Sequence, residues 1–361
     1  MTLSALAKEL GVSAATVSNA YNRPDQLSEA LRTRILARAA ALGFAGPDPM
    51  ARGLRRGRVG AVGVLVDQSL SYAFSDPVAV LFLDGLALEL QSDGYGLLLH
   101  SGFVGEAAAR PVEGADVRRI SDAAVDAWVI QSLPQDHPAV AAVQARGRPL
   151  VVLDQPLLPG VPVVGIADEH GGAIAFQHLL DLGHRRIVVL STPLSGDGSV
   201  GLADLDRQHT ARYRTVRERL AGAASAAAAA GLPWSGVPVF ECAANDPGAG
   251  MRGMSELLLA RSAPTAVLAM SDQLAIGALR AADRGGVLVP EHLSVVGFDD
   301  APAAQHTTPA LTTVAQPLLD RGRAVGTLVL ALLAGAPAPS PPAAPVRLVA
   351  RASSGPVPDG A

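Results

Sequence analysis

Cysteine, aromatic residues and long apolar runs are scarce or missing in this sequence. The 361 residues include one cysteine, Cys242, and aromatic side chains make up 4% of the chain. A single cysteine excludes a disulfide framework and a thiolate metal cluster. No apolar run reaches the roughly 20 residues that cross a bilayer. The first residues lack the charged-then-apolar pattern of a signal peptide. We therefore expect a soluble, cytoplasmic protein with no membrane partner.

The abundant residues indicate a large α/β core. Hydrophobic residues make up 49% of the chain, and alanine, valine, leucine and glycine dominate. That mixture is typical of buried parallel strands covered by alanine-rich helices. The chain is also longer than one ordinary domain. We expect more than one domain.

The charges are distributed unevenly. The first 60 residues hold nine cations and four anions, a net charge of +5, whereas the rest of the chain carries −9. A basic segment beside an acidic body is the pattern expected for a polyanion partner such as DNA. A solvated charged face would give the same count, so the charge alone leaves both interpretations open.

The basic segment predicts three short helices. Each of the residues Thr2, Ser13 and Ser28 precedes apolar residues at helical spacing and can cap a helix. Gly11 permits a tight turn between the first two helices, and Gly43 ends the third. Two short helices joined at a glycine and braced by a third form the helix-turn-helix layout.

The second of these helices has a small, polar outer face that suits the DNA major groove. Ala14 and Ala15 can meet thymine methyl groups, and Asn19 can bind an adenine edge. An ordinary capped surface helix is the alternative for this window. Other small polar side chains are suited to phosphate oxygens: Thr2, Thr16, Ser18 and Asn22.

Residues 2–44 carry a specific resemblance. The stretches "TLSALAKELGVSAATVSNAYN" and "LSEALRTRILARAAALGF" resemble the DNA-binding head of the lactose-repressor (LacI/GalR) family of bacterial transcription regulators. The chain departs from the usual pattern at Ala5, where an aspartate is common, at Ala20 and Tyr21, and at Phe44. The resemblance implies a homodimer on double-stranded operator DNA.

The next stretch, "GPDPMARGLRRGRVGAVGVLV", resembles the hinge of that family. The resemblance implies that Leu54 wedges into the minor groove, with Ala51 one turn earlier. Arg52 and Arg55 would then neutralise phosphates. A plain basic linker is the alternative.

From residue 59 onwards apolar strands alternate with helices, which we predict near 77–93, 136–146, 212–231 and 272–284. The alternation indicates two doubly wound parallel sheets, which bind ligands at the carboxyl ends of their strands. Residues 202–210, "LADLDRQHT", are predicted to form a polar loop. The glycine pattern at 196–201 is followed by no predicted helix, so we do not expect a dinucleotide site there.

This body resembles the effector-binding core of the same family, which has the fold of periplasmic binding proteins. The stretches are "HLLDLGHRRIVVLS", "TAVLAMSDQLAIGALRAADRGGVLVPEHLSVVGFDD" and "TTPALTTVAQPLLDRG". The resemblance implies a helix-turn-helix domain at 1–45, a hinge at 46–58, a core at 59–356 and a tail at 357–361. Within the core, one subdomain would comprise 59–164 and 316–343, and the other 165–315 and 344–356.

The resemblance also assigns an effector cleft. Carboxylates, amides and an arginine fork suit a polyhydroxylated ligand, and an aromatic side chain covers the apolar face of a sugar ring. Arg219 and Asp299 can instead pair with each other, and Ser271 replaces the usual asparagine. The implied contacts are Tyr72, Phe74, Asp76, Asp154, Arg219, Asn245, Ser271, Asp272, Gln273 and Asp299.

We therefore expect a ligand-responsive transcription regulator, a repressor that needs no cofactor and is not an enzyme. Its effector would be a sugar or sugar derivative. A purine effector, or a signal from a protein co-regulator, remains an alternative. A sugar-binding transport protein would share the core, but it would need a signal peptide and no basic head. An enzyme is the remaining rival, although no G-x-S-x-G nucleophile motif occurs.

Overall fold

The computed structural model describes residues 2–44, 46, 58–104, 110–111, 113–260 and 262–357. The chain divides into two compact units, Met1–Gly60 and Ala61–Ala361, which we call the head and the core. The expected hinge contacts Ala51, Arg52, Leu54 and Arg55 lie outside the described residues. None of the helices within the described ranges has both the length and the apolar character needed to cross a membrane.

The head contains the three predicted helices. The side chains of Thr2, Ser13 and Ser28 each accept a hydrogen bond from a backbone amide of the first turn, which confirms the three caps. Gly11 ends the first helix with a φ of 66°, as its tight turn requires. The helices are α1 (Leu3–Leu10), α2 (Ala14–Asn22) and α3 (Glu29–Ala41), with a short 3₁₀ turn at Pro24–Gln26. Their shared core consists of Leu6, Ala7, Val17, Ala20, Ile35 and Ala39.

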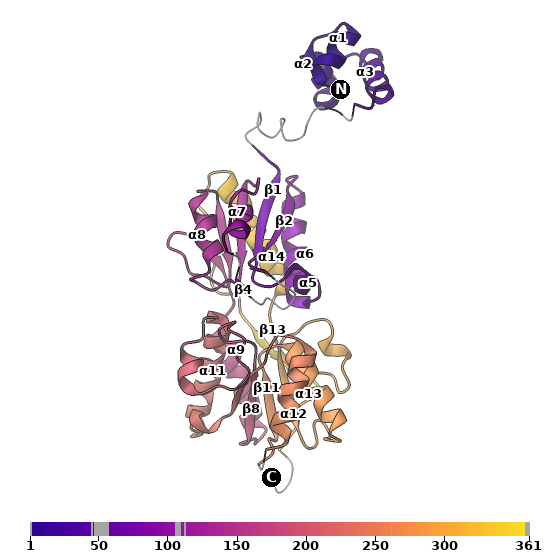
Figure 1. The fold of residues 1–361 in the computed structure, drawn as a ribbon. Helices are drawn as coiled ribbons and strands as arrows, with labels where there is room; N and C mark the ends of the chain where they lie inside the picture. Colours follow the sequence, from indigo (N-terminus) through magenta and orange to yellow (C-terminus); the bar gives the residue numbers. More distant parts are fainter. Residues whose placement is uncertain are drawn as a thin grey trace. The chain divides into compact units, whose positions relative to one another are not determined.

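The core has two halves, each an α/β layer structure (Figure 1). The first half holds a five-stranded parallel sheet in the order β2-β1-β5-β6-β7. Helices α6 and α14 contribute to the hydrophobic cluster on one face, and α7 and α8 to the cluster on the other. The elements are β1 (Ala61–Val66), α5 (Leu70–Ala73), α6 (Pro77–Gln91), β2 (Gly96–Ser101), β3 (Phe103–Val104), β4 (Arg110–Pro111), α7 (Ala115–Ser121), β5 (Ala127–Gln131), α8 (Pro138–Ala145), β6 (Leu150–Leu153), β7 (Val163–Val164) and α14 (Leu318–Leu333).

The second half holds a seven-stranded sheet in the order β14-β13-β12-β11-β8-β10-β9, whose two edge strands are antiparallel. Helices α9 and α11 pack on one face, and α12 and α13 on the other. The elements are α9 (Asp168–Asp181), β8 (Ile187–Ser191), β9 (Gly201–Leu202), α10 (Leu205–His209), α11 (Arg214–Ala229), η2 (Trp234–Gly236), β10 (Val239–Glu241), α12 (Pro247–Leu258), β11 (Ala266–Ala269), α13 (Asp272–Arg284), β12 (Ser294–Asp299), η3 (Ala304–His306), β13 (Thr312–Ala315) and β14 (Arg347–Val349).

The chain passes between the halves three times. It leaves the first half after β7, returns between β13 and α14, and crosses again before β14. The first and third passages lie together, because Ile166 and Ala344 form a parallel β-bridge. Both sheets are predominantly parallel and doubly wound, so the predicted fold class is confirmed.

The prediction of a polar loop at 202–210 was wrong. This segment contains the last residue of β9 and the whole of the short helix α10. The carboxylate of Asp204 accepts a 2.8 Å hydrogen bond from the backbone amide of Arg207 and so caps α10. Helix α11 begins at Arg214 and ends at Ala229, close to the predicted 212–231.

Two glycines bring α9 and α11 into backbone contact. A Cβ atom at Gly172 would lie 2.0 Å from the carbonyl oxygen of Arg219, and one at Gly222 would lie 1.8 Å from that of Glu169. Neither position can accept a side chain while the helices keep this spacing. The close approach fixes the part of α11 that carries Arg219.

Candidate functional site

Helix α2 presents the small outer face that the sequence predicts. Ala14 and Ala15 are exposed, whereas Val17 and Ala20 on the opposite side are fully buried. The remaining predicted DNA contacts in the head are exposed or partly exposed: Thr2, Thr16, Ser18, Asn19 and Asn22. The face is thin and carries small hydrogen-bonding groups, as a helix needs to enter a major groove.

Two asparagines on α2 differ in how far they are engaged. The amide nitrogen of Asn19 donates to the side-chain oxygen of Gln26 at 3.1 Å. That nitrogen carries two hydrogens, so one of them and the amide oxygen remain for an adenine edge. The amide nitrogen of Asn22 donates to the carbonyl and the hydroxyl oxygens of Ser18, at 3.0 and 3.2 Å. Asn19 is therefore less engaged within the protein than Asn22, and its base-reading role stays a prediction.

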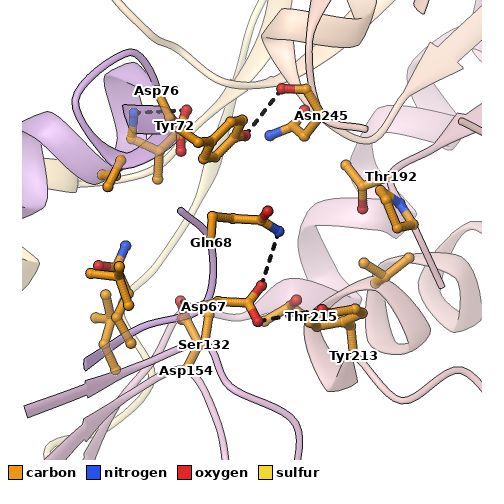
Figure 2. Close-up of a pocket in the computed structure, with 18 residues that line it drawn as sticks. Asp67, Gln68, Tyr72, Asp76, Ser132, Asp154, Thr192, Tyr213, Thr215 and Asn245 are labelled. Atoms are coloured by element: carbon orange, nitrogen blue, oxygen red, sulfur yellow. Dashed lines mark hydrogen bonds between the residues drawn. The ribbon is translucent and has the colours of Figure 1, made fainter. Parts of the chain in front are cut away.

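The core contains a cavity between its two halves, at the carboxyl ends of the parallel strands (Figure 2). Its volume is about 180 Å³. Residues of both halves line it: Val66, Asp67, Gln68, Tyr72, Ala73, Asp76, Val78, Ala79, Gln131, Ser132, Leu153 and Asp154 from the first half, and Thr192, Pro193, Tyr213, Thr215, Val216 and Asn245 from the second. This is where doubly wound sheets place their ligands.

Hydrogen bonds already link the two walls of the cavity. The hydroxyl of Tyr72 donates to the backbone carbonyl oxygen of Asn245 at 3.0 Å, and that of Tyr213 donates to Asp67 Oδ1 at 3.3 Å (Figure 2). The backbone amide of Arg214 also donates to Oε1 of Gln155. Each link joins the first half, through helix α5 or a residue just beyond a strand, to a loop or helix of the second.

Strained backbone gathers at the same strand ends. Within the described ranges, the non-glycine residues with positive φ are Ser132 at 59°, Asp154 at 64°, Asp299 at 119° and Asp300 at 54°. They follow or end the strands β5, β6 and β12. Such conformations cost on the order of 1–3 kcal/mol each and occur preferentially at functional sites. The strained residues therefore mark the carboxyl ends of strands in both sheets as a candidate functional region.

Asp154 begins a buried polar chain that joins the halves. Its carboxylate accepts a hydrogen bond from Ser132 Oγ at 3.1 Å and forms an ion pair with Arg321 of α14. Arg321 also donates to the side-chain oxygen of Gln316, in the passage between β13 and α14. The amide of Gln316 in turn donates to Asp299 Oδ1 at 2.6 Å, at the end of β12.

Arg219 continues this chain within the second half. Its Nε donates to Asp168 Oδ1 at 2.7 Å and its Nη1 to the carbonyl oxygen of Met270 at 2.8 Å. The guanidinium lies 3.6 Å above the centre of the Phe298 ring, and Nη1 is 3.9 Å from Asp299 Oδ1. Burial raises the pKa of Asp168, and the positive charge of Arg219 opposes that rise. The guanidinium is thus engaged with protein groups, and Arg219 is not among the cavity-lining residues.

Some of the other predicted effector contacts line the cavity, and others do not. Tyr72, Asp76, Asp154 and Asn245 line the cavity. Phe74 does not, because it lies two residues beyond Tyr72 at the end of the short helix α5 and so points the other way. Its surface is 65% exposed.

The corner at the start of α13 has a mainly internal role in this structure. Ser271 caps α13 and donates to the side-chain oxygen of Asn245. The buried carboxylate of Asp272 accepts from Thr313 Oγ1 at 2.6 Å and from the amide of Ala301 at 2.7 Å. Gln273 is partly buried on α13 and does not line the cavity.

Two carboxylates of the first half differ from ordinary surface acids. Burial raises the pKa of Asp67 to about 7, against the opposing hydrogen bonds from Tyr213 and Gln68. Burial also raises the pKa of Asp76 to about 6. Burial therefore disfavours the ionised form of both groups more than it does for a surface acid.

Several lining residues were missed by the sequence analysis, notably Asp67, Gln131, Ser132, Thr192 and Tyr213. The rule that ligands lie at the carboxyl ends of parallel strands applies to four of them, because Asp67, Gln131, Ser132 and Thr192 end or directly follow β1, β5 and β8. Tyr213 precedes α11 and has no such signal.

Comparisons with known proteins agree with this architecture. A family model described as a periplasmic binding protein-like domain matches residues 176–354. A helix-turn-helix-type transcriptional regulator of Mycolicibacterium smegmatis is 40% identical over 334 residues, which cover 91% of this chain and 89% of that protein. A helix-turn-helix head followed by a two-halved core of this type defines a transcription regulator.

Solved structures make the assignment more specific. A LacI-family transcriptional regulator from Corynebacterium glutamicum superimposes with a TM-score of 0.72 at 34% identity, covering 98% of both chains. The complex of the regulator CelR with cellobiose gives a TM-score of 0.70 at 28% identity, covering 98% of this chain and 99% of that one. The present chain belongs to the LacI family of transcription regulators.

Proposed function

We propose that this chain is a repressor that binds a near-palindromic operator as a homodimer, and that a small polyhydroxylated molecule in the core cavity controls its affinity for DNA. The cavity is the observation that carries the proposal, because its lining comes from both halves of the core. A ligand there contacts both halves at once. It therefore has different affinities for their open and closed arrangements, which is the condition for a population shift.

The ligand class follows from the lining. Carboxylates, amides and hydroxyls surround the space, including Asp67, Gln68, Gln131 and Thr215, and the aromatic ring of Tyr72 borders it. Such groups exchange hydrogen bonds with the hydroxyls of a sugar or sugar derivative. A volume of about 180 Å³ suits one small ring. The similarity to the CelR–cellobiose complex supports a sugar.

The mechanism couples the cavity to the head through the core. In the proposal, closure of the two halves around the ligand changes the geometry at the start of β1, from which the head of each protomer is carried. Two heads bound to paired half-sites require a fixed spacing. If closure disturbs that spacing, the operator is released.

The test is fluorescence anisotropy of the full-length protein on labelled DNA from upstream of its own gene. We expect selective, saturable binding that weakens steeply with salt and shifts when one sugar of a panel is added. Selective binding that no sugar changes would support the proposed DNA-binding repressor and contradict the proposed polyhydroxylated effector. Absence of selective binding across a genome-wide fragment selection would contradict the proposal.

A further inference from the structure

The cavity contains two carboxylates whose hydrogen bonds are weak. Gln68 and Tyr213 approach the oxygens of Asp67 at 3.3 Å each, and the amide of Val78 approaches Asp76 Oδ1 at 3.3 Å. Hydrogen bonds to an ionised carboxylate are usually about 2.7–2.9 Å long. Asp76 also accepts from the backbone amide of Ala79 where it caps α6, so both groups keep part of their acceptor capacity for a ligand.

A third acceptor in the cavity has no donor. The side-chain oxygen of Gln131 is buried, and in the part of the chain that the structure describes no donor reaches it. Gln131 lines the same cavity as the two carboxylates. A buried acceptor without a partner is costly in a folded protein, so a ligand that donates to it would be favoured.

No positive side chain lines the cavity to balance these groups within the described residues. The positive charge of Arg212 acts on Asp67, but Arg212 lies outside the lining and is paired with Asp136. Tyr72 and Asp299 interact electrostatically with Asp76. The cation beside Asp299 is Arg219, which lies outside the lining and is paired with Asp168. Asp154, the remaining acid of the lining, is neutralised by Arg321.

We infer that the cavity selects a polyhydroxylated ligand that has no acidic group, and that it excludes sugar phosphates and sugar acids. The inference rests on the proposed function, because it specifies the ligand of the same cavity. Hydroxyl or ammonium groups would donate to Asp67, Asp76 and Gln131. A phosphate or carboxylate would place a further negative charge beside Asp76, which is buried, and Asp67, which is half-buried, where water screens the repulsion only in part.

The first test is titration calorimetry of the full-length protein at pH 7.5 with matched sets of ligands. Each set contains one aldohexose or cyclitol ring and its amino, phosphate and carboxylate derivatives. Within a ring that binds, we expect the neutral or amino member to bind, and the phosphate and carboxylate members to bind at least about 100-fold more weakly. Equal or tighter binding of an acidic member would overturn the inference.

Variants test whether the carboxylates of Asp67 and Asp76 cause the exclusion of acidic ligands. In the double variant Asp67→Asn, Asp76→Asn, we expect the difference between the neutral and acidic members to shrink by about tenfold or more. The control is Asp84→Asn, an exposed acid on the helix that Asp76 caps. An unchanged difference in the double variant would overturn the assignment.

Thermal melting tests the electrostatic argument without any ligand. The raised pKa of Asp67 means that its charged form destabilises the fold, by an amount that is absent below about pH 4 and complete above about pH 7. We therefore expect Asp67→Asn to raise the Tm at pH 8 by about 2 °C or more and to leave it unchanged at pH 4. A lower Tm at pH 8 would overturn the inference. If no ring binds at all, the proposed polyhydroxylated effector is contradicted. The thermal melting of Asp67→Asn still tests whether the charge of Asp67 is unfavourable.

Discussion

The hydroxyl of Tyr72 on α5 donates a 3.0 Å hydrogen bond to the backbone carbonyl oxygen of Asn245, and so joins the two halves of the core across the cavity. Tyr72 and Asn245 are 173 residues apart in the chain. The bond exists only while the halves face each other at this distance. It therefore stabilises the arrangement of the two halves seen in this structure.

Replacing Tyr72 by phenylalanine tests this role. The ring is retained, and the loss of one hydrogen bond is worth about 0.5–1.5 kcal/mol. We expect the population of this arrangement, in which the cavity is formed, and hence the ligand affinity measured by calorimetry, to fall by about two- to tenfold. Ser75→Ala is the matched control, since the Ser75 hydroxyl donates only to the nearby carbonyl of Tyr72 among the bonds described. If Tyr72→Phe and the control bind the ligand with equal affinity, the hydrogen bond does not stabilise the arrangement that binds it.

Arg219 is expected to contribute strongly to the stability of the core. Asp168 is 1% exposed, so Arg219→Ala leaves a buried carboxylate without its cation. Breaking a buried pair in this way costs about 3–5 kcal/mol, which urea unfolding measures. Adding Asp168→Asn to Arg219→Ala removes the stranded charge and should recover part of the loss.

Arg284→Ala, at an exposed position near the end of α13, provides the control for loss of an arginine. It should change the free energy of unfolding by less than about 0.5 kcal/mol. If Arg219→Ala costs no more than this control, then its contacts with Asp168 and Met270 do not stabilise the core.

Asn19→Ala tests base reading by the head. A bidentate contact to a base is worth about 1–3 kcal/mol. We expect affinity for the selected operator to fall by about 5- to 150-fold, while affinity for unrelated DNA stays the same. Anisotropy titrations at one fixed salt concentration measure both. Asn22→Ala is the comparison: its amide is engaged with Ser18, and any loss should be similar on both DNAs.

Gly172→Ala tests the contact between α9 and α11. The added methyl group would lie 2.0 Å from the carbonyl oxygen of Arg219, so the helices must separate. Overpacking of this kind costs about 1–3 kcal/mol or more, and the separation also disturbs the Arg219–Asp168 pair. Gly236→Ala is the control, because a Cβ there meets no atom within 4 Å. Equal thermal stability of the two variants would show that the helices adjust without cost.

The helices of the head were predictable because their signals are local. Thr2, Ser13 and Ser28 cap helices through amides three residues away, and such contacts depend on nothing distant. The strand and helix alternation of the core was equally readable, since buried parallel strands form continuous apolar runs. Helix α10 was missed because it spans only Leu205–His209 and has no apolar periodicity of useful length.

The composition of the cavity was much harder to predict. The resemblance to a family assigned Arg219 to the ligand, but the partners that engage its guanidinium come from α9 and the end of β11, distant segments whose approach depends on glycines. Phe74 and Tyr72 are two residues apart, and only the short turn of α5 decides which of them faces inward. Tyr213 reaches Asp67 across 146 residues of sequence.

The crossed connections have a consequence for how this chain is made. Helix α14, which emerges from the ribosome among the last segments, covers the first sheet beside α6, and its Arg321 neutralises Asp154. Until then the first half has an uncovered apolar face and an unpaired buried acid. The head, by contrast, is complete after about one sixth of the chain has been synthesised. Nascent chains should therefore contain a folded head well before either half of the core can finish folding.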